Sequence, residues 1–489
     1  MKIRSALTAA SLSILTLTLA PALAQEEMLS AEAVLRDLNI ARTALEDIHP
    51  GYTRFTERAA LDAMWAELEA EAANGMSGRE FYLGLAAILG AIRCDHTKAE
   101  LPQAWIDRRE EDPVYLPFRF DVFDGRMYVD NPGDTGLTRG DEILAIDGVA
   151  ASERMTAILP LIAIDGFTDH TRWVTMVRSG EELGSGFDHY DPLLNPDDAR
   201  VEIRSRNRQG EEETRLLDRL TYSDFRAITG VTEWRNLSDA DAVEVTYPAD
   251  GVATLAVNTF VNYRTPVDPD TVFGPVMDEI AARDTQTLIV DMRRNGGGST
   301  DAQNSLIAHL SRGFVSPLAD IRVKTLEFGS SRAFIDTWDP AALNPPQEDF
   351  VRREDGWWSY NREAYPLING FDAAENAFDG QLILLIGPGN ASGATQMIGA
   401  LSVRGDTLLV GEPTGGTQEG PTAGVLYFLE LPESGIRVRV PWQFWESSIP
   451  DPVIGYGFNP DVSAPLTLDA WLADRDPALE AALEIASAD

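Results

Sequence analysis

A serine placed between an apolar strand and a helix is the feature that most constrains the fold of this chain. The apolar run at 382–386 breaks in a Gly-Pro-Gly-Asn turn at 387–390, presents Ser392, and continues with helical spacing at 394–401. A buried strand that turns directly into a helix is typical of an α/β fold. The serine stands at the start of the helix, where unpaired backbone N–H groups can stabilise a developing oxyanion. Ser392 is therefore a candidate nucleophile.

A second unit of the same kind occurs earlier in the chain. We predict a buried strand at 287–292, then the glycines at 296–298, then a helix at 302–310. Three glycines at the end of a strand let backbone N–H groups come close to a ligand. The loop lacks the trailing Lys-Ser/Thr of a phosphate loop, so nucleotide binding is not expected. Opposite a nucleophile, the loop is a candidate oxyanion partner.

The N-terminal residues have the pattern of an export signal. Lys2 and Arg4 precede an apolar run at 6–19, and an Ala-Leu-Ala cleavage pattern ends at Ala24, before Gln25. We expect residues 1–24 to be removed and the mature protein to be periplasmic or secreted. No other stretch is apolar over the about 18 residues that a membrane span requires, so no span is expected in the mature protein.

Composition excludes several other classes of function. The formal charge of −38 argues against nucleic-acid partners and against binding to anionic membranes. The single cysteine, Cys94, excludes an intrachain disulfide. No metal-ligand cluster and no cofactor loop is evident in the sequence, so neither a metal nor a cofactor is expected. A chain of 489 residues is long enough for two or three domains.

The hydrophobic periodicity divides the mature chain into three regions. Helical spacing dominates 25–111, with a capping box at Ser77 and Glu80. Short alternating runs bounded by Gly-Asp and Asp-Gly turns mark 112–220 as a β-module with an insertion at 151–192. The module resembles a PDZ domain, which binds extended peptides by strand addition; the alternative is a small β-domain that only packs on the core. Strands alternating with helices make 221–489 an α/β core. Within that core, the long stretch 313–380 is predicted to be a partly structured excursion over the active face, either a lid or ordinary surface packing.

His96 is the histidine best placed for a catalytic role. It is one of five histidines in the chain, and it lies just past the end of an apolar helix, where a side chain can project into a cleft. A lone histidine is more often structural than catalytic, so the assignment of a catalytic role to His96 depends on the surrounding motifs.

Six short motifs occur in one order along the chain: Asp95-His96-Thr97, Gly140-Asp141, LIVDMRRNGGG at 288–298, Asn390-Ala391-Ser392-Gly393-Ala394, Val410-Gly411-Glu412-Pro413-Thr414 and Asn459-Pro460-Asp461-Val462. This order resembles the S41 peptidase family, which includes the C-terminal processing (tail-specific) proteases and the tricorn-core-like enzymes. The resemblance implies a ClpP/crotonase-like α/β core with a helical N-terminal region and a PDZ-like module. It also implies Ser392 as the nucleophile, with oxyanion donors from the loop at Gly297 and from the Gly393 amide.

The sequence departs from the C-terminal processing branch in its base. Those enzymes pair serine with a lysine that follows a Gly-Glu-Pro-Thr segment, whereas the mature chain has only Lys98 and Lys324, neither in that region. A Ser–Lys dyad is thus excluded unless Lys98 is recruited. The tricorn-like branch uses serine, histidine and glutamate, so the resemblance implies His96 as the general base. A serine hydroxyl needs such a base near neutral pH.

A third group should orient the imidazole, and the sequence leaves its identity open. The candidates are Glu446, Asp451 and, with less support, Glu419. We favour Asp451, although an aspartate before Pro452 is equally typical of a turn.

The resulting prediction is an exported serine peptidase that cleaves polypeptides and needs no cofactor. Two alternatives remain: an esterase that uses the same serine, and a non-catalytic peptide- or lipophile-binding scaffold of the same fold. The Ser392 Oγ is expected within hydrogen-bond reach of an imidazole nitrogen, about 2.6–3.2 Å or looser without a ligand.

Overall fold

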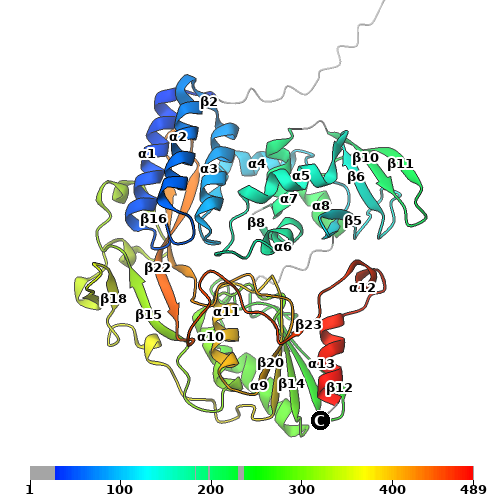
Figure 1. Cartoon of the computed structure of the whole chain (residues 1–489), viewed down its shortest axis with the longest axis vertical. Helices are drawn as coiled ribbons and strands as arrows, with labels where there is room; N and C mark the ends of the chain where they lie inside the picture. Colours follow the sequence, from blue (N-terminus) through cyan, green and yellow to red (C-terminus); the bar gives the residue numbers. More distant parts are fainter. Residues whose placement is uncertain (1–27, 182, 197–198, 230–235, 488–489) are drawn as a thin grey trace, which may run out of the picture.

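The computed structural model describes residues 28–181, 183–196, 199–229 and 236–487. The predicted signal peptide at 1–24 lies outside these residues. Figure 1 shows the N-terminal helices and the β-module side by side, the α/β core on the opposite side of the molecule, and an antiparallel sheet that connects the helices to the core.

Four helices form the N-terminal region, and their ends follow the expected signals. Ser30 caps the first helix by accepting a hydrogen bond from the Ala33 N–H, and His49 ends it. The predicted capping box is confirmed, because Ser77 and Glu80 each bind the other's backbone N–H. The helices are α1 (Ala31–Ile48), α2 (Arg58–Glu71), α3 (Gly78–Ile92) and α4 (Gln103–Glu111).

The β-module is an antiparallel sheet in the order β11-β10-β6-β5-β4, with β7 paired to β6. Asp124 and Asp147 each adopt a positive φ before a glycine, which turns the chain between paired strands. The predicted insertion contains three helices. The elements are β4 (Phe120–Phe123), β5 (Arg126–Val129), β6 (Glu142–Ile146), β7 (Val149–Ala150), α5 (Ala151–Ile158), α6 (Thr171–Val177), α7 (Gly186–Leu194), β10 (Arg200–Arg206) and β11 (Glu212–Asp218).

The α/β core is built on a sheet in the order β12-β13-β14-β19-β20-β23, parallel from β13 onward. Along β19, Leu382, Leu384 and Ile386 pack into one cluster and Ile383 and Leu385 into another, because successive side chains leave a strand on opposite faces. Helices α9, α10 and α11 contribute side chains to the first cluster, and α13 to the second.

Both faces of this sheet are therefore buried, as the nearly continuous apolar strands predicted. The elements are β12 (Val243–Ala249), β13 (Val252–Val257), α9 (Pro269–Ala282), β14 (Thr287–Asp291), α10 (Thr300–Leu310), β19 (Gln381–Ile386), α11 (Ser392–Ser402), β20 (Thr407–Gly411), β23 (Val462–Ser463), α12 (Leu468–Leu472) and α13 (Pro477–Ser487).

The stretch 313–380, predicted to be partly structured, forms part of a sheet. It supplies four strands to a seven-stranded sheet in the order β16-β21-β22-β15-β18-β17, with β3 paired to β22. Buried residues of this sheet, among them Val323, Tyr427 and Trp442, pack in one cluster with the N-terminal helices. The strands are β3 (Ala99–Glu100), β15 (Leu318–Val323), β16 (Ile335–Asp336), β17 (Phe350–Arg352), β18 (Trp358–Tyr360), β21 (Thr422–Glu430) and β22 (Arg437–Ser447).

Candidate active site

The turn that carries Ser392 is held in a sparsely populated backbone conformation. Ser392 has φ +49° and begins α11, directly after β19 and its four-residue turn. A positive φ in a residue other than glycine costs free energy and persists where surrounding contacts impose it. Asn390 supplies such contacts: its Oδ1 accepts from the Gly387 N–H at 2.8 Å, and its Nδ2 donates to the carbonyls of Met292 and Asn295. The serine turn is thus tied to the neighbouring glycine loop.

The glycine loop lies directly against the serine turn. Strands β14 and β19 are paired in parallel with Asp291 opposite Leu385, so their carboxyl ends meet at one edge of the sheet. A methyl group placed on Gly297 would lie 2.8 Å from the Gly393 nitrogen and 2.9 Å from the Ser392 Cβ. Gly297 also has φ +100°, so a glycine is required there on both grounds.

The oxyanion donors differ in part from the sequence prediction. The Gly297 N–H donates to Asn295 Oδ1 at 2.8 Å, and the Gly297 carbonyl accepts from the Phe260 N–H. The Gly297 amide is therefore engaged, which corrects its predicted role as a donor. Within the described parts of the chain, the Gly298 and Gly393 amides have no hydrogen-bond acceptor. The Gly298 nitrogen lies 3.7 Å from the position of a Cβ on Gly393.

His96 lies in a buried cluster just beyond the end of α3. Arg93, in the left-handed conformation, ends the helix and turns the chain toward Cys94 and His96. One ligand-type atom from each of Cys94, His96 and Asp165 lies within 4.8 Å of the others. Burial lowers the pKa of the His96 imidazole, although the Asp95 carboxylate opposes this, whereas burial raises the pKa of Asp165 to about 7.

Two buried polar atoms in this cluster have no hydrogen-bond partner among the described residues. They are Nδ1 of His96 and Oδ2 of Asp165. The other oxygen of Asp165, Oδ1, accepts from the Asp95 N–H at 2.9 Å. An orphaned buried polar atom is rare in a folded protein and often marks a functional site.

A short bridge connects the His96 cluster to the serine turn. Thr168 lies three residues after Asp165 in the chain, and its Oγ1 donates to the Gly415 carbonyl at 2.8 Å. The Gly415 N–H in turn donates to the Asn390 carbonyl at 2.9 Å, two residues before Ser392. The described residues contain no hydrogen bond between Ser392 Oγ and the His96 ring, so the expected direct bond is absent from this structure.

Neither favoured candidate for the third group contacts His96. Asp451 is exposed, in a turn with φ +50°, and it has no ion pair or side-chain hydrogen bond among the described residues. Glu446 pairs instead with Arg322 at 3.2 Å. Glu419 is buried, pairs with Arg54 at 3.0 Å, and accepts from the Gly455 N–H. Besides Asp95, the neighbouring residue, Asp165 has a carboxylate oxygen within 4.8 Å of a His96 ring nitrogen, and nothing in the sequence pointed to Asp165.

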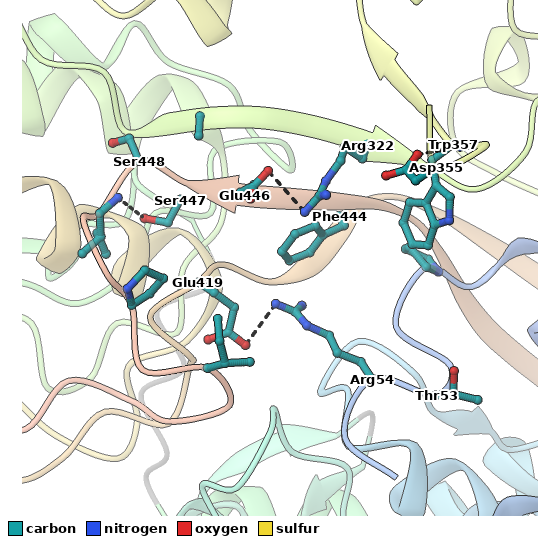
Figure 2. Close-up of a pocket in the computed structure, with 15 residues that line it drawn as sticks. Thr53, Arg54, Arg322, Asp355, Trp357, Glu419, Phe444, Glu446, Ser447 and Ser448 are labelled. Carbon is teal, nitrogen blue, oxygen red and sulfur yellow. Dashed lines mark hydrogen bonds and ion pairs between the residues drawn. The ribbon is translucent and has the colours of Figure 1, made fainter. Parts of the chain in front are cut away.

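A pocket of about 610 Å³ lies next to this region, between the N-terminal region, the seven-stranded sheet and the segment after β22. Figure 2 shows Phe444 between two arginines, each of which is paired with a carboxylate. The Cζ atom of Arg54 lies 4.1 Å from the centre of the Phe444 ring, and that of Arg322 lies 4.9 Å from it. Sequence analysis missed this pocket because its walls come from segments up to about 400 positions apart.

Lys98 and Lys324 make contacts away from Ser392. Lys98 forms an ion pair with Asp95 at 3.6 Å, and Lys324 donates to the Glu46 carbonyl. Among the helices of the described residues, none has the length and apolar character needed to cross a membrane.

Comparison with known proteins finds one matching family model and several similar structures. Residues 251–464 match the model of peptidase family S41. The chain resembles the structure of mature CPAF complexed with lactacystin (14% identity, TM-score 0.62), covering 93% of this chain and 97% of that one. A second structure of mature CPAF gives 14% identity and a TM-score of 0.59 over 90% of this chain and 94% of that one. No match is found among curated proteins. The predicted S41 resemblance and α/β fold class are confirmed.

Proposed function

We propose, on the premise that residues 251–464 belong to peptidase family S41, that this chain is an exported serine peptidase acting on polypeptides. Ser392 is the nucleophile and His96 the general base. One observation carries the proposal: Ser392 has φ +49° at the start of α11 and lies in close contact with the glycine loop, where there is no room for a Cβ on Gly297. This arrangement sets a half-buried serine beside backbone amides that have no acceptor among the described residues, as acyl transfer requires.

In the proposed reaction, Ser392 Oγ attacks the carbonyl carbon of the scissile peptide bond while His96 takes the hydroxyl proton. The negative charge that develops on the carbonyl oxygen accepts hydrogen bonds from the amides of Gly393 and Gly298. The imidazolium then gives its proton to the leaving amine. Water hydrolyses the acyl-enzyme by the same steps in reverse order.

Asp165 takes the positioning role that the sequence analysis assigned to Asp451 or Glu446. Its Oδ2 and the His96 Nδ1 are both buried and have no hydrogen-bond partner among the described residues, and the two residues have ligand-type atoms within 4.8 Å of each other. A small rotation would let each satisfy the other, which would fix the imidazole tautomer. Asp165→Asn is expected to lower kcat with little change in KM, and Asp165→Glu to restore part of the loss. A change in KM alone would contradict this role.

In this proposal, the pocket of Figure 2 binds part of the polypeptide substrate. One of its walls is Glu419, three residues beyond the Gly416 amide that binds Asn390. Trp357 lines the pocket and is half-buried. Trp357→Ala is expected to raise KM several-fold with kcat unchanged, since it removes binding common to ground and transition states. An unchanged KM would place the substrate elsewhere.

A fluorophosphonate probe, which reacts with activated serines, tests the central proposal. Labelling should be abolished by Ser392→Ala and reduced about 10²–10⁴-fold by His96→Gln. Matched controls are Ser402→Ala, at the other end of α11, and His170→Gln, an exposed histidine; both should label normally. Labelling unaffected by His96→Gln would reject the base, and absence of labelling would favour the non-catalytic scaffold. Turnover of an ester without turnover of the matching peptide would favour the esterase.

Export is tested separately. The N-terminus of the protein recovered from the periplasm or the medium should be Gln25, because the cleavage pattern ends at Ala24. An intact Met1 on protein retained in the cytoplasm would contradict export and would leave the chemistry of Ser392 untouched.

A further inference from the structure

The proposed mechanism leaves one buried reactive group without a role, the thiol of Cys94. It is 3% exposed, and its sulfur donates to the Thr422 carbonyl at 3.6 Å. It shares a cluster with His96 and Asp165 in which one ligand-type atom from each residue lies within 4.8 Å of the others. A thiol, an imidazole and a carboxylate are the three ligand types that zinc prefers in proteins.

We propose that Cys94, His96 and Asp165 form a Zn²⁺ site, and that zinc bound there inhibits the peptidase by occupying the proposed general base. The inference rests on the proposed function for its inhibitory consequence, but the binding itself does not. When zinc binds, the Cys94 thiol gives up its proton and the sulfur donates an electron pair. A nitrogen of His96 and an oxygen of Asp165 donate lone pairs without a change in oxidation state.

The geometry requires only a small contraction of the cluster. With Zn–S near 2.3 Å and Zn–N and Zn–O near 2.0–2.2 Å, tetrahedral ligand atoms stand roughly 3.3–3.6 Å apart, against the present limit of 4.8 Å. The contraction is therefore at most about 1.5 Å.

An independent observation also points to a ligand at this place. Asp165 is 5% exposed; its Oδ1 accepts from the Asp95 N–H, and its Oδ2 has no partner within the described part of the chain. The same is true of the buried Nδ1 of His96. A cation would satisfy both atoms at once, whereas an apolar environment leaves them unpaired at a cost in stability. His96 is half-buried, whereas Cys94 and Asp165 are buried, so His96 is the member of the cluster nearest to solvent.

Three protein ligands leave the fourth zinc position open. Open positions are typical of zinc sites that exchange their metal or bind a further small ligand, whereas structural sites are closed by four protein ligands. The proposed site is thus suited to reversible occupation. A peptidase inhibited in this way would be inactive where zinc is abundant and active where zinc is scarce.

The direct test is a titration of the reduced, chelator-treated protein with Co²⁺, which replaces zinc and reports a bound thiolate by a sulfur-to-cobalt charge-transfer band. One equivalent should produce the band, and Zn²⁺ should displace it. Cys94→Ser should abolish the band and weaken Zn²⁺ binding by more than about tenfold, because a soft ligand is lost. His96→Gln should weaken binding comparably, and the exposed-histidine control His170→Gln should not.

Peptidase activity is a separate readout. Zn²⁺ should inhibit the wild type, and Cys94→Ser should require more than about tenfold more Zn²⁺ for the same fractional inhibition, each variant being compared with its own metal-free rate. Ser392→Ala, which removes the proposed nucleophile, should still give the Co²⁺ band. If that band appears but no variant has activity, the proposed function fails and the metal site stands. No band, or a band that Cys94→Ser leaves unchanged, would overturn the site.

Discussion

Gly297→Ala is the substitution that tests the geometry of the candidate active site most sharply. The added methyl would lie 2.8 Å from the Gly393 nitrogen and 2.9 Å from the Ser392 Cβ. An oxyanion that accepts from the Gly393 N–H must itself lie about 2.7–3.1 Å from that nitrogen. The methyl would therefore crowd the approach to the donor without removing any functional group.

The expected magnitude follows from the loss of one oxyanion donor. Such a loss lowers kcat by about 10²–10³-fold, equivalent to about 2.7–4 kcal/mol of transition-state stabilisation. KM should change little, because the crowding acts where charge develops in the transition state. The φ of +100° at this position adds a strain of about 1–2 kcal/mol for a residue with a Cβ, so the free energy of unfolding should fall by a similar amount.

The neighbouring glycine provides the matched control. A methyl on Gly296 would meet only the Gly389 carbonyl oxygen, at the ordinary distance of 3.8 Å, and Gly296 does not lie in the left-handed region. Gly296→Ala should therefore retain most of its activity and stability. Both variants are assayed for peptide turnover, for fluorophosphonate labelling and for unfolding by urea. If Gly297→Ala is folded and keeps its kcat within about threefold of the wild type, the loop is not part of an oxyanion site and the reasoning is refuted.

Three further substitutions test individual contacts. Glu419→Gln leaves the Arg54 guanidinium without its carboxylate and should lower the free energy of unfolding, measured in urea, by about 2 kcal/mol. The double variant with Arg54→Met should recover part of this loss, and no recovery would mean that the two residues do not act as a pair. Burial lowers the pKa of His49 from 6.5 to about 3, so the unfolded chain binds a proton at His49 before the folded protein does as the pH falls below 6.5. By pH 5 the free energy of unfolding should fall by about 2 kcal/mol, and the His49→Gln variant should not show this loss. Equal pH dependence of unfolding for the two proteins would exclude the effect. Ser77→Ala removes the α3 cap and should cost about 1 kcal/mol, whereas an unchanged denaturation midpoint would show that the cap is dispensable.

The sequence predicted those parts of the site that depend on neighbouring residues. The strand, turn and helix around Ser392 and the strand and glycine loop before α10 are local patterns, and the structure has both close to the predicted bounds. The hydrogen bond that engages the Gly297 N–H could also have been predicted from neighbouring residues. An asparagine two residues before a glycine commonly accepts from that glycine's N–H, and Asn295 does so here.

The parts that the sequence analysis missed depend on contacts between distant segments. Asp165 lies in the insertion of the β-module, 69 positions after His96, and no spacing rule relates the two (165 − 96 = 69). Asp451, the favoured candidate for the third group, instead has the positive φ of a turn residue. The strands within 313–380 are short, and two of them, β15 and β16, pair with the distant strands β22 and β21, so no local hydrophobic period predicted them.

These differences follow from how the site is divided between regions of the fold. The parallel pairing of β14 with β19 fixes the serine turn against the glycine loop, and the Asn390 side chain joins the two; all of these belong to the α/β core. His96 instead follows a helix of the N-terminal region, and Asp165 belongs to the β-module. The position of the proposed base relative to the nucleophile is therefore set by packing between regions, through the contact of Thr168 with Gly415. Contacts between regions form and break more readily than a buried parallel sheet. We therefore expect the proposed nucleophile and the neighbouring amides to be held more rigidly than the proposed base.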